Sequence, residues 1–281
     1  MKRREVISNV FNEYKDYSSQ IFKLATADLK KTYNGSALGW AWAVIKPLTT
    51  ILVFWFAFSV GLRSGKNIYP VPYVLWIIAG MVPWFFLREM LTEGAGALRR
   101  YKHLVTKMTF PISTIPGFVN IAHFYVHLFL LGLMIIIYNL LGVHPSIYYL
   151  QLPIYLVLIF LFGWIWAFFS SLLSAMSKDF LNFVKSSTSA LFWLSAVMWD
   201  VNLIPARHHW VRVILKFNPV TFFSEGYRNV YAGATTFITE YAPDKKRGFY
   251  AALLDWGSYM GNALGAGLVT VLMIALPPDL H

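Results

Sequence analysis

Few side chains in this chain have the type and spacing that chemistry needs, and none of them completes a catalytic set. His123 and His127 lie one helical turn apart, as two metal ligands would. Phe124 and Tyr125 fill the interval in which a zinc protease carries its glutamate, and no third ligand is evident. Histidines that hydrogen-bond to neighbouring helices are therefore the default interpretation. The absence of cysteine excludes disulfides, thiolate metal sites and cysteine nucleophiles.

A glycine-containing stretch, residues 61–67, comes nearest to a phosphate-binding loop but does not match one. It has three residues between Gly61 and Gly65 instead of four, and Asn67 stands where a serine or threonine would hold Mg²⁺. No Asp or Glu occupies the middle of an apolar stretch, so coupling to a proton or sodium gradient is not expected. The sequence therefore predicts no cofactor on this chain, and any ATP and Mg²⁺ that drive it bind another subunit.

Six apolar stretches must position these groups. At a rise of about 1.5 Å per residue, a stretch of about twenty residues is long enough to cross a hydrocarbon core of ~30 Å. Hydrophobic residues make up 57% of the chain and charged residues 13%, below the ~25% typical of soluble domains. We therefore expect an all-α polytopic membrane protein, a single transmembrane domain over residues 1–281 with six transmembrane helices. Their predicted bounds are 41–62, 71–91, 117–142, 152–176, 180–201 and 257–276.

The distribution of Lys and Arg sets the predicted orientation. Seven precede the first span, two lie in the loop after it, and four lie between the second and third spans. The positive-inside rule then places the N-terminus in the cytoplasm. The net charge of +11 follows from this topology and from contact with anionic membrane lipids, so nucleic acid is not an expected partner. One loop conflicts with the rule, because residues 202–256 contain seven Lys and Arg residues although six spans place them outside.

Two segments on the cytoplasmic side carry a pattern of their own. Residues 17–33 are typical of an amphipathic helix that lies in the membrane interface, or of one packed on its own protein. Residues 94–116 start with Gly94-Ala95-Gly96, where the second span can end, and continue into a short basic helix over 98–108. That helix is either a docking site for a cytoplasmic partner or a solvated basic loop, and the residue pattern favours neither.

The extracellular loop 202–256 and the fifth span are also unusual. In the loop, an apolar stretch broken by Asn218-Pro219 is too short to cross the membrane and predicts short re-entrant helices. The fifth span alternates hydroxyl residues with aromatic residues. The hydroxyl residues are small and allow neighbouring helices to pack closely in lipid. The same side chains can line a path for a sugar polymer, whose rings stack on aromatic faces and whose hydroxyls need partners. The pattern alone does not separate these two interpretations.

Several motifs together resemble the permease subunits of ATP-binding-cassette polysaccharide exporters. The resemblance runs from about residue 17 to about residue 233. Its motifs are Asp28-Leu29-Lys30-Lys31-Thr32-Tyr33, Ser36-Ala37-Leu38-Gly39, Trp42, Lys46-Pro47-Leu48, Lys107-Met108-Thr109-Phe110-Pro111, Asn218-Pro219 and Gly226-Tyr227-Arg228. Within that family, three further motifs look most like the wall teichoic acid exporters: Phe54-Trp55-Phe56, Gly61-Leu62-Arg63-Ser64-Gly65 and Val82-Pro83-Trp84-Phe85-Phe86.

The resemblance implies a homodimeric permease, flanked by two copies of a separate ATPase that binds ATP and Mg²⁺. The dimer would export an undecaprenyl-diphosphate-linked polymer across the cytoplasmic membrane of a bacterium. Segment 98–108 would then be the helix that couples to the ATPase. The implied coupling residues are Leu98, Arg99, Arg100, Tyr101, Lys102, His103, Leu104, Lys107 and Phe110. The implied substrate path includes Trp42, Lys46, Ser187, Phe192 and Trp199, and Lys30 and Lys31, with Lys46, are candidates for binding the lipid diphosphate.

The C-terminal end departs from the resemblance. Family members usually finish with a basic, aromatic tail after the sixth span, whereas this sequence stops at Leu276-Pro277-Pro278-Asp279-Leu280-His281. The predicted sixth span is also rich in glycine. We expect a permease for a lipid-linked cell-envelope polymer, with wall teichoic acid as the first candidate and O-antigen or capsule polysaccharide as the alternative. An integral-membrane glycosyl- or acyltransferase is the enzyme alternative. Its outward candidates, Asp200, Glu225 and His208-His209, match no acid–base arrangement.

Overall fold

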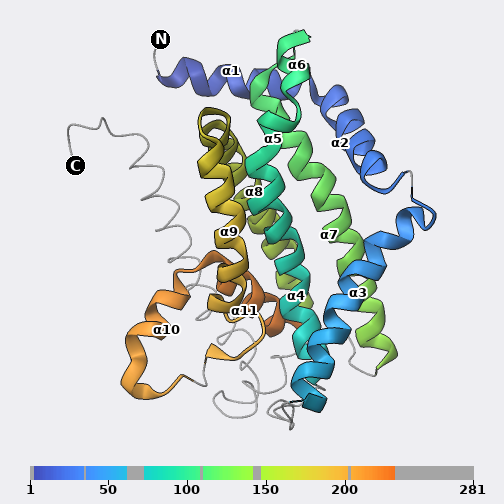
Figure 1. Cartoon of the computed structure of the whole chain (residues 1–281), viewed down its shortest axis with the longest axis vertical. Coiled ribbons are helices and arrows are strands. Elements are labelled where there is room, and N and C mark those ends of the chain that lie inside the picture. The colour runs from blue at the N-terminus through green and yellow to red at the C-terminus, as the bar shows by residue number, and fades with distance from the viewer. Residues whose placement is uncertain are drawn as a thin grey trace.

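The computed structural model describes residues 3–34, 36–61, 73–107, 110–141, 147–201 and 204–231, and every regular element within them is a helix (Figure 1). Four long helices, α4, α7, α8 and α9, run side by side along the longest axis (Figure 1). The α-helices are α1 (Arg3–Asp16), α2 (Ser18–Tyr33), α3 (Trp42–Trp55), α4 (Tyr73–Glu89), α5 (Ala95–Arg100), α6 (Lys102–Lys107), α7 (Ile115–Leu140), α8 (Leu152–Met176), α9 (Lys178–Leu194), α10 (His209–Lys216) and α11 (Pro219–Tyr231).

Four stretches are long and apolar enough to cross a membrane, and they overlap the first four predicted spans. These are Gly39–Phe58, Tyr73–Leu104, Ile112–Leu140 and Tyr149–Met176. The fifth predicted span forms α9, but this helix ends at Leu194 after 17 residues, and the following turn places Ala196 at φ 53°. The sixth predicted span, 257–276, and residues 232–256 of the loop before it lie outside the described residues.

The predicted end of the second span at Gly94-Ala95-Gly96 is wrong. Helix α4 continues through a π-helical turn, Met90–Gly94, directly into α5. A Cβ atom added at Gly94 would lie 3.0 Å from the Cβ of Ala167 in α8. The glycine therefore serves the close approach of two helices, which is a common use of small residues in membrane proteins, and it does not end the helix.

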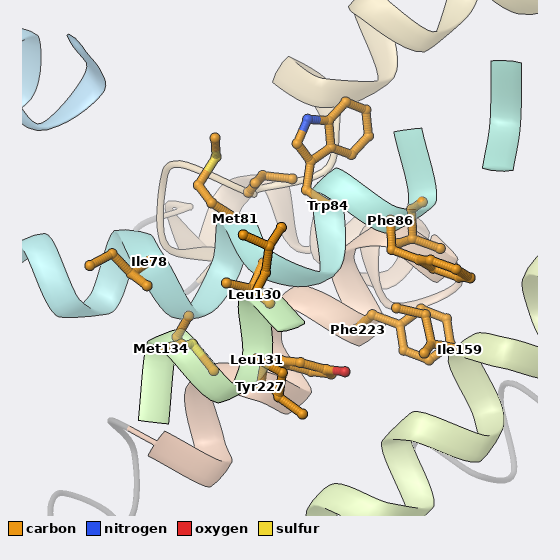
Figure 2. Packing of buried hydrophobic residues seen from close by; sticks show 14 of the residues in the cluster. Ile78, Met81, Trp84, Phe86, Leu130, Leu131, Met134, Ile159, Phe223 and Tyr227 are labelled. Atoms are coloured by element: carbon orange, nitrogen blue, oxygen red, sulfur yellow. The ribbon is translucent and has the colours of Figure 1, made fainter. Parts of the chain in front are cut away.

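The core lies where α4, α7, α8 and α11 meet (Figure 2). Helix α4 is buried along almost its whole length and supplies Ile78, Met81, Trp84 and Phe86. Opposite these lie Leu131 and Met134 of α7, Ile159 of α8, and Phe223 and Tyr227 of α11. Lipid tails are as apolar as these side chains, so close packing stabilises the bundle more than removal from water does. Helix α4 is consequently the central element of the bundle.

The two N-terminal helices lie at one end of the bundle, near α5 and α6. We call this end the α1 end, because α1 lies across it (Figure 1). Helix α1 was not expected, since its sequence is polar and lacks an apolar run. Helix α2 packs against α7, and its Ile21 and Ala25 are buried there. Phe22 points away and is 53% exposed. The apolar stripe of residues 17–33 thus packs on its own protein, as one of the two interpretations of this segment expected.

Candidate functional site

A cavity of about 580 Å³ lies between α3, α4 and α9. Each helix contributes one face to it. The lining residues are Thr50 and Phe54 of α3, Met81, Trp84, Phe85 and Arg88 of α4, Thr92 and Glu93 of the π-turn, and Lys185, Thr188, Ser189, Phe192 and Trp193 of α9. On α4 and α9 these positions recur three or four residues apart, which places them on one side of each helix. The cavity is therefore built by regular helix faces.

The chemistry of the cavity changes along its length. Its charged side chains, Arg88, Glu93 and Lys185, lie on the parts of α4, the π-turn and α9 nearest the α1 end. Hydroxyl groups of Thr188 and Ser189 follow one turn further along α9. Aromatic side chains line the part beyond them. A long polar ligand entering from the α1 end would meet charges first, then hydroxyls, then aromatic faces.

The aromatic part of the cavity is held together by contacts between rings. Phe192 lies 5.4 Å from Phe54 and 5.1 Å from Trp84, measured between ring centroids. Trp193 meets Phe192 edge-on at 5.3 Å and Phe54 edge-on at 6.1 Å. Ring pairs at such separations stabilise each other beyond the area they bury. The wall is therefore preformed without a ligand.

Of the predicted path residues, the structure places Phe192 on the cavity wall. Trp42, Lys46, Ser187 and Trp199 are not among the lining residues in the described part of the chain. Trp199 instead donates its indole N–H to the carbonyl of Trp193, at 3.0 Å. The Lys46 ammonium lies 5.9 Å from the Trp42 ring centre, and its side chain is exposed.

The sequence analysis did not identify which face of α9 lines the cavity. Lys185, Thr188, Ser189 and Phe192 follow a spacing of three or four residues, and Ser187 falls off that face. The signal was therefore present in the helical period of the sequence.

The predicted coupling segment consists of two short helices, α5 and α6, that meet at Tyr101. Leu98, Tyr101 and Leu104 are buried in a second apolar cluster with α2 and α7. Lys102 and His103 are exposed. The side chain of Lys107 lies outside the described residues, and Phe110 is half-buried against the ring of Tyr17. The outward face available to a partner is consequently narrow.

Both arginines of the coupling segment have partners inside the protein. Arg99 donates to the carbonyl oxygens of Ser174 and Ala175 at the last turn of α8. These carbonyls lack helical partners, and the positive charge suits the negative end of the helix dipole. Arg100 forms ion pairs with Glu93, at 2.5 Å, and with Asp28, at 3.5 Å. The arginines thus fasten the segment to α8, α2 and the π-turn.

The N-terminal helices are tied to the same region by polar contacts. Asp28 of α2 accepts a hydrogen bond from the hydroxyl of Tyr101. Tyr14 of α1 donates to the carbonyl of Ser113, at 2.9 Å, and accepts from the indole N–H of Trp164, at 2.8 Å. Burial raises the pKa of Tyr14 to about 12, so the hydroxyl keeps its proton at neutral pH. Lys30 and Lys31, the predicted diphosphate residues, are exposed on α2 and do not line the cavity.

At the other end of the bundle, α11 is pinned beside α9 and α4. Asn218 begins the helix by accepting from the backbone N–H of Val220, at 2.9 Å, and donates to the Ser195 hydroxyl, also at 2.9 Å. Asn218-Pro219 therefore starts a helix as well as ending one. The predicted short helices after the fifth span are present as α10 and α11, and their re-entry from the outside stays a prediction.

Arg228 of α11 is buried and makes four contacts, which join α11 to α4 and to the turn after α9. Its guanidinium donates to the carbonyls of Ala196, at 2.9 Å, and Val197. It pairs with Glu225 at 2.7 Å and stacks 3.4 Å from the ring centre of Trp76. We call this group the Arg228 clamp. Glu225, an outward candidate of the enzyme alternative, thus serves as the partner of a buried cation.

The histidine pair does not gather a third metal ligand. His127 bonds through Nε2 to the hydroxyl of Tyr227, at 2.7 Å, which links α7 to α11. Within the described residues no group of three His, Asp or Glu side chains could hold a metal. The default interpretation of His127, a hydrogen bond to a neighbouring helix, is confirmed.

Fold and cavity together define a multi-span membrane protein with a lined interior surface, and comparison with known proteins gives its family. A sequence profile described as "ABC-2 type transporter" matches residues 19–232, and the chain belongs to this family. An O-antigen export system permease protein RfbA from Myxococcus xanthus is 23% identical over 222 residues, covering 78% of this chain and 82% of that protein. A protein of the same name from Klebsiella pneumoniae is 27% identical over 214 residues, covering 74% of this chain and 78% of that protein.

A second, shorter similarity points to a different kind of transporter. The ectoine/proline transporter ProP of Corynebacterium glutamicum is 49% identical over 63 residues, which is 22% of this chain and 12% of that protein. Residues 1–18 and residues 233–281, the two parts of the chain outside the family match, are each shorter than this stretch, so the stretch overlaps the family match in part. Residues 233–281 are the longer part of the chain outside the family match, and they include the end that departs from the exporter resemblance.

Proposed function

We propose that this chain is the transmembrane permease subunit of an ATP-driven exporter that moves a lipid-linked cell-envelope polysaccharide out of a bacterial cell. The observation that carries the proposal is the graded cavity between α3, α4 and α9. Aromatic faces suit sugar rings, hydroxyl groups suit sugar hydroxyls, and the charges near the α1 end suit an ionic headgroup. Membership of the ABC-2 type transporter family and the two O-antigen permeases support the same class of cargo.

Two cargoes compete within this class. The names of the two relatives favour an O-antigen polysaccharide. Wall teichoic acid is the second candidate, because the motifs that resemble its exporters supply part of the aromatic wall, namely Phe54, Trp84 and Phe85. Complementation of two export-deficient strains, one lacking its O-antigen permease and one lacking its teichoic acid permease, distinguishes them. Surface polymer restored in one strain and not in the other assigns the cargo.

We further propose that a dimer of this chain docks two ATPase subunits at the α1 end, which would face the cytoplasm. Lys102 and His103 are exposed there, while Arg99 and Arg100 are occupied by internal partners. A push on α6 would pass through α5 and the π-turn into α4, because these elements are continuous. The ATPase would thereby act on the central helix that lines the cavity.

The docking proposal predicts that charge reversal at Lys102 weakens ATPase binding and leaves the permease folded. The Lys102→Glu variant is co-expressed with the ATPase encoded beside it and purified through a tag on the permease. We expect at least a tenfold loss of co-purified ATPase with an unchanged melting temperature. Lys216→Glu, an exposed lysine in the last turn of α10 at the other end of the bundle, is the control. Full recovery of the ATPase with Lys102→Glu would contradict the proposed docking face.

A further inference from the structure

We propose that Arg88 and Lys185 form an anion-binding subsite at the charged end of the cavity, which binds the diphosphate of the lipid carrier. The inference rests on the proposed function and makes it more specific. It moves the diphosphate site from the lysines of α2 to two cations on the helices that line the cavity, α4 and α9. The first sugar would then lie against the hydroxyl and aromatic part of the same cavity.

The placement of the two cations supports this assignment. Arg88 and Lys185 come from different helices and line the same cavity. Thr92 lines the cavity one turn after Arg88, but its hydroxyl already donates to the Arg88 carbonyl, at 3.0 Å. A diphosphate bound between α4 and α9 would therefore find one guanidinium and one ammonium. Guanidinium groups bind phosphate oxygens two at a time, whereas an ammonium acts as a compact point charge.

Two carboxylates lie close to the two cations, and each of them already has a cationic partner. Glu93 also lines the cavity, but its carboxylate pairs with Arg100 at 2.5 Å. Glu89 lies 3.7 Å from Arg88, and both side chains are substantially exposed, at 39% and 54%. Such an exposed ion pair is weak, so a doubly charged ligand can displace it. Lys185 forms no ion pair with an acidic side chain in the described part of the chain.

The other cations near the α1 end are less suited to this task. Arg99 is held by the end of α8, and Arg100 is held by Glu93 and Asp28. Lys30 and Lys31 lie on α2, away from the cavity lining, and Lys46 is exposed beside Trp42. Among the described residues, Arg88 and Lys185 are the cations that face the path itself. The carrier would thus be positioned where the polymer enters.

The test is equilibrium binding of a fluorescent farnesyl diphosphate to the purified full-length permease in nanodiscs. We compare the parent chain with Arg88→Gln, Lys185→Gln and the double variant, and use Lys178→Gln as the matched control on α9. Each single change should weaken binding roughly 5- to 10-fold, since a charge-assisted contact is lost at a partly exposed site. The control should bind as the parent does. Melting temperatures establish that all variants are folded.

Competitors identify the source of the anion. Farnesyl diphosphate without the fluorophore should displace the probe, while farnesyl monophosphate should compete at least tenfold less well. Nanodiscs enriched in phosphatidylglycerol test whether any anionic headgroup occupies the site, and displacement of the probe by this lipid would overturn the diphosphate assignment. Undiminished probe binding in the double variant, or loss of binding in Lys30→Gln/Lys31→Gln alone, would also overturn it.

Polymer export in cells separates this inference from the proposed function. Export that persists at the parent level in the double variant would refute the subsite while leaving the permease function intact. Specific diphosphate binding that depends on Arg88 and Lys185, in a chain that never supports export with its ATPase, would support the subsite and contradict the proposed function.

Discussion

Removal of the Arg228 guanidinium should destabilise the protein more than any change at its exposed cations. The side chain is 3% exposed and satisfies the carbonyls of Ala196 and Val197 as well as the carboxylate of Glu225. Replacement by Gln removes the ion pair with the largely buried Glu225 carboxylate and the guanidinium donors to the two carbonyls. Breaking a buried pair in this way typically costs 3–5 kcal/mol, so we expect a loss of about 3 kcal/mol or more.

The assay is thermal unfolding of the purified permease in a fixed detergent or nanodisc, followed by near-ultraviolet circular dichroism. Arg228→Gln should lower the melting temperature by about 5 °C or more, on the scale of ~2–4 °C per kcal/mol for chains of this size. Arg228→Lys should recover part of the loss, because an ammonium cannot contact both carbonyls and stack on Trp76 at once. Arg207→Gln, at an exposed position, is the control.

A second variant tests the same clamp from the other side. A Cβ atom added at Gly80 would lie 2.6 Å from Nη2 of Arg228 and 2.9 Å from the carbonyl oxygen of Val197. Gly80→Ala should therefore displace the guanidinium and lower the melting temperature. If Arg228→Gln and Gly80→Ala both unfold within about 1 °C of the parent, the clamp does not contribute as the contacts indicate.

Two further predictions concern α1 and the C-terminal region. Tyr14→Phe leaves the Ser113 carbonyl and the Trp164 indole N–H without this partner and should cost about 1–3 kcal/mol, measured by thermal unfolding; an unchanged melting temperature would contradict it. Burial raises the pKa of Tyr14 from 10.0 to about 12, so its hydroxyl stabilises the fold fully below pH 10 and less as the pH rises toward 12. The chain has no cysteine, so Lys246→Cys gives a single labelling site. The six-span topology predicts that a membrane-impermeant maleimide labels intact cells at this residue; labelling only after permeabilisation would refute it.

The labelling result also bears on the basic residues that conflict with the positive-inside rule. The cluster Lys245-Lys246-Arg247 belongs to the loop 202–256, which the six-span topology places outside. A cytoplasmic cluster would remove the conflict with the positive-inside rule. It would also mean that this segment does not continue the exporter topology.

The first four spans could be predicted from the sequence because length and apolarity are local properties. An apolar stretch as long as 152–176 predicts a membrane-crossing helix without knowledge of its neighbours, and α8 has the same bounds. The end of the second span could not be predicted, because a glycine that ends a helix and a glycine that allows a close helix contact look the same in the sequence. Gly94 is of the second kind, since it lies against Ala167. Only the neighbouring helix shows which use applies.

The site was predicted in part for similar reasons. The choice of α3 and α9 as lining helices rested on residue types and on the resemblance, and both helices line the cavity. Of the chosen side chains, Phe192 lines the cavity, whereas Ser187 lies off the face of α9 that Thr188 and Phe192 share. Contacts such as Asp28 with Tyr101 and Tyr14 with Ser113 join residues about 70 to 100 positions apart, and no local pattern contains them.

The central claim is that this chain exports a polymer only together with a separate ATPase. The most direct measurement is ATP-dependent movement of a labelled lipid-linked polysaccharide into proteoliposomes that contain the permease and the ATPase encoded beside it. The proposal predicts transport that requires both chains and ATP, with an ATPase rate that rises when the lipid-linked polymer is added. Transport by the permease alone, or an ATPase that neither binds the permease nor responds to the polymer, would contradict the account.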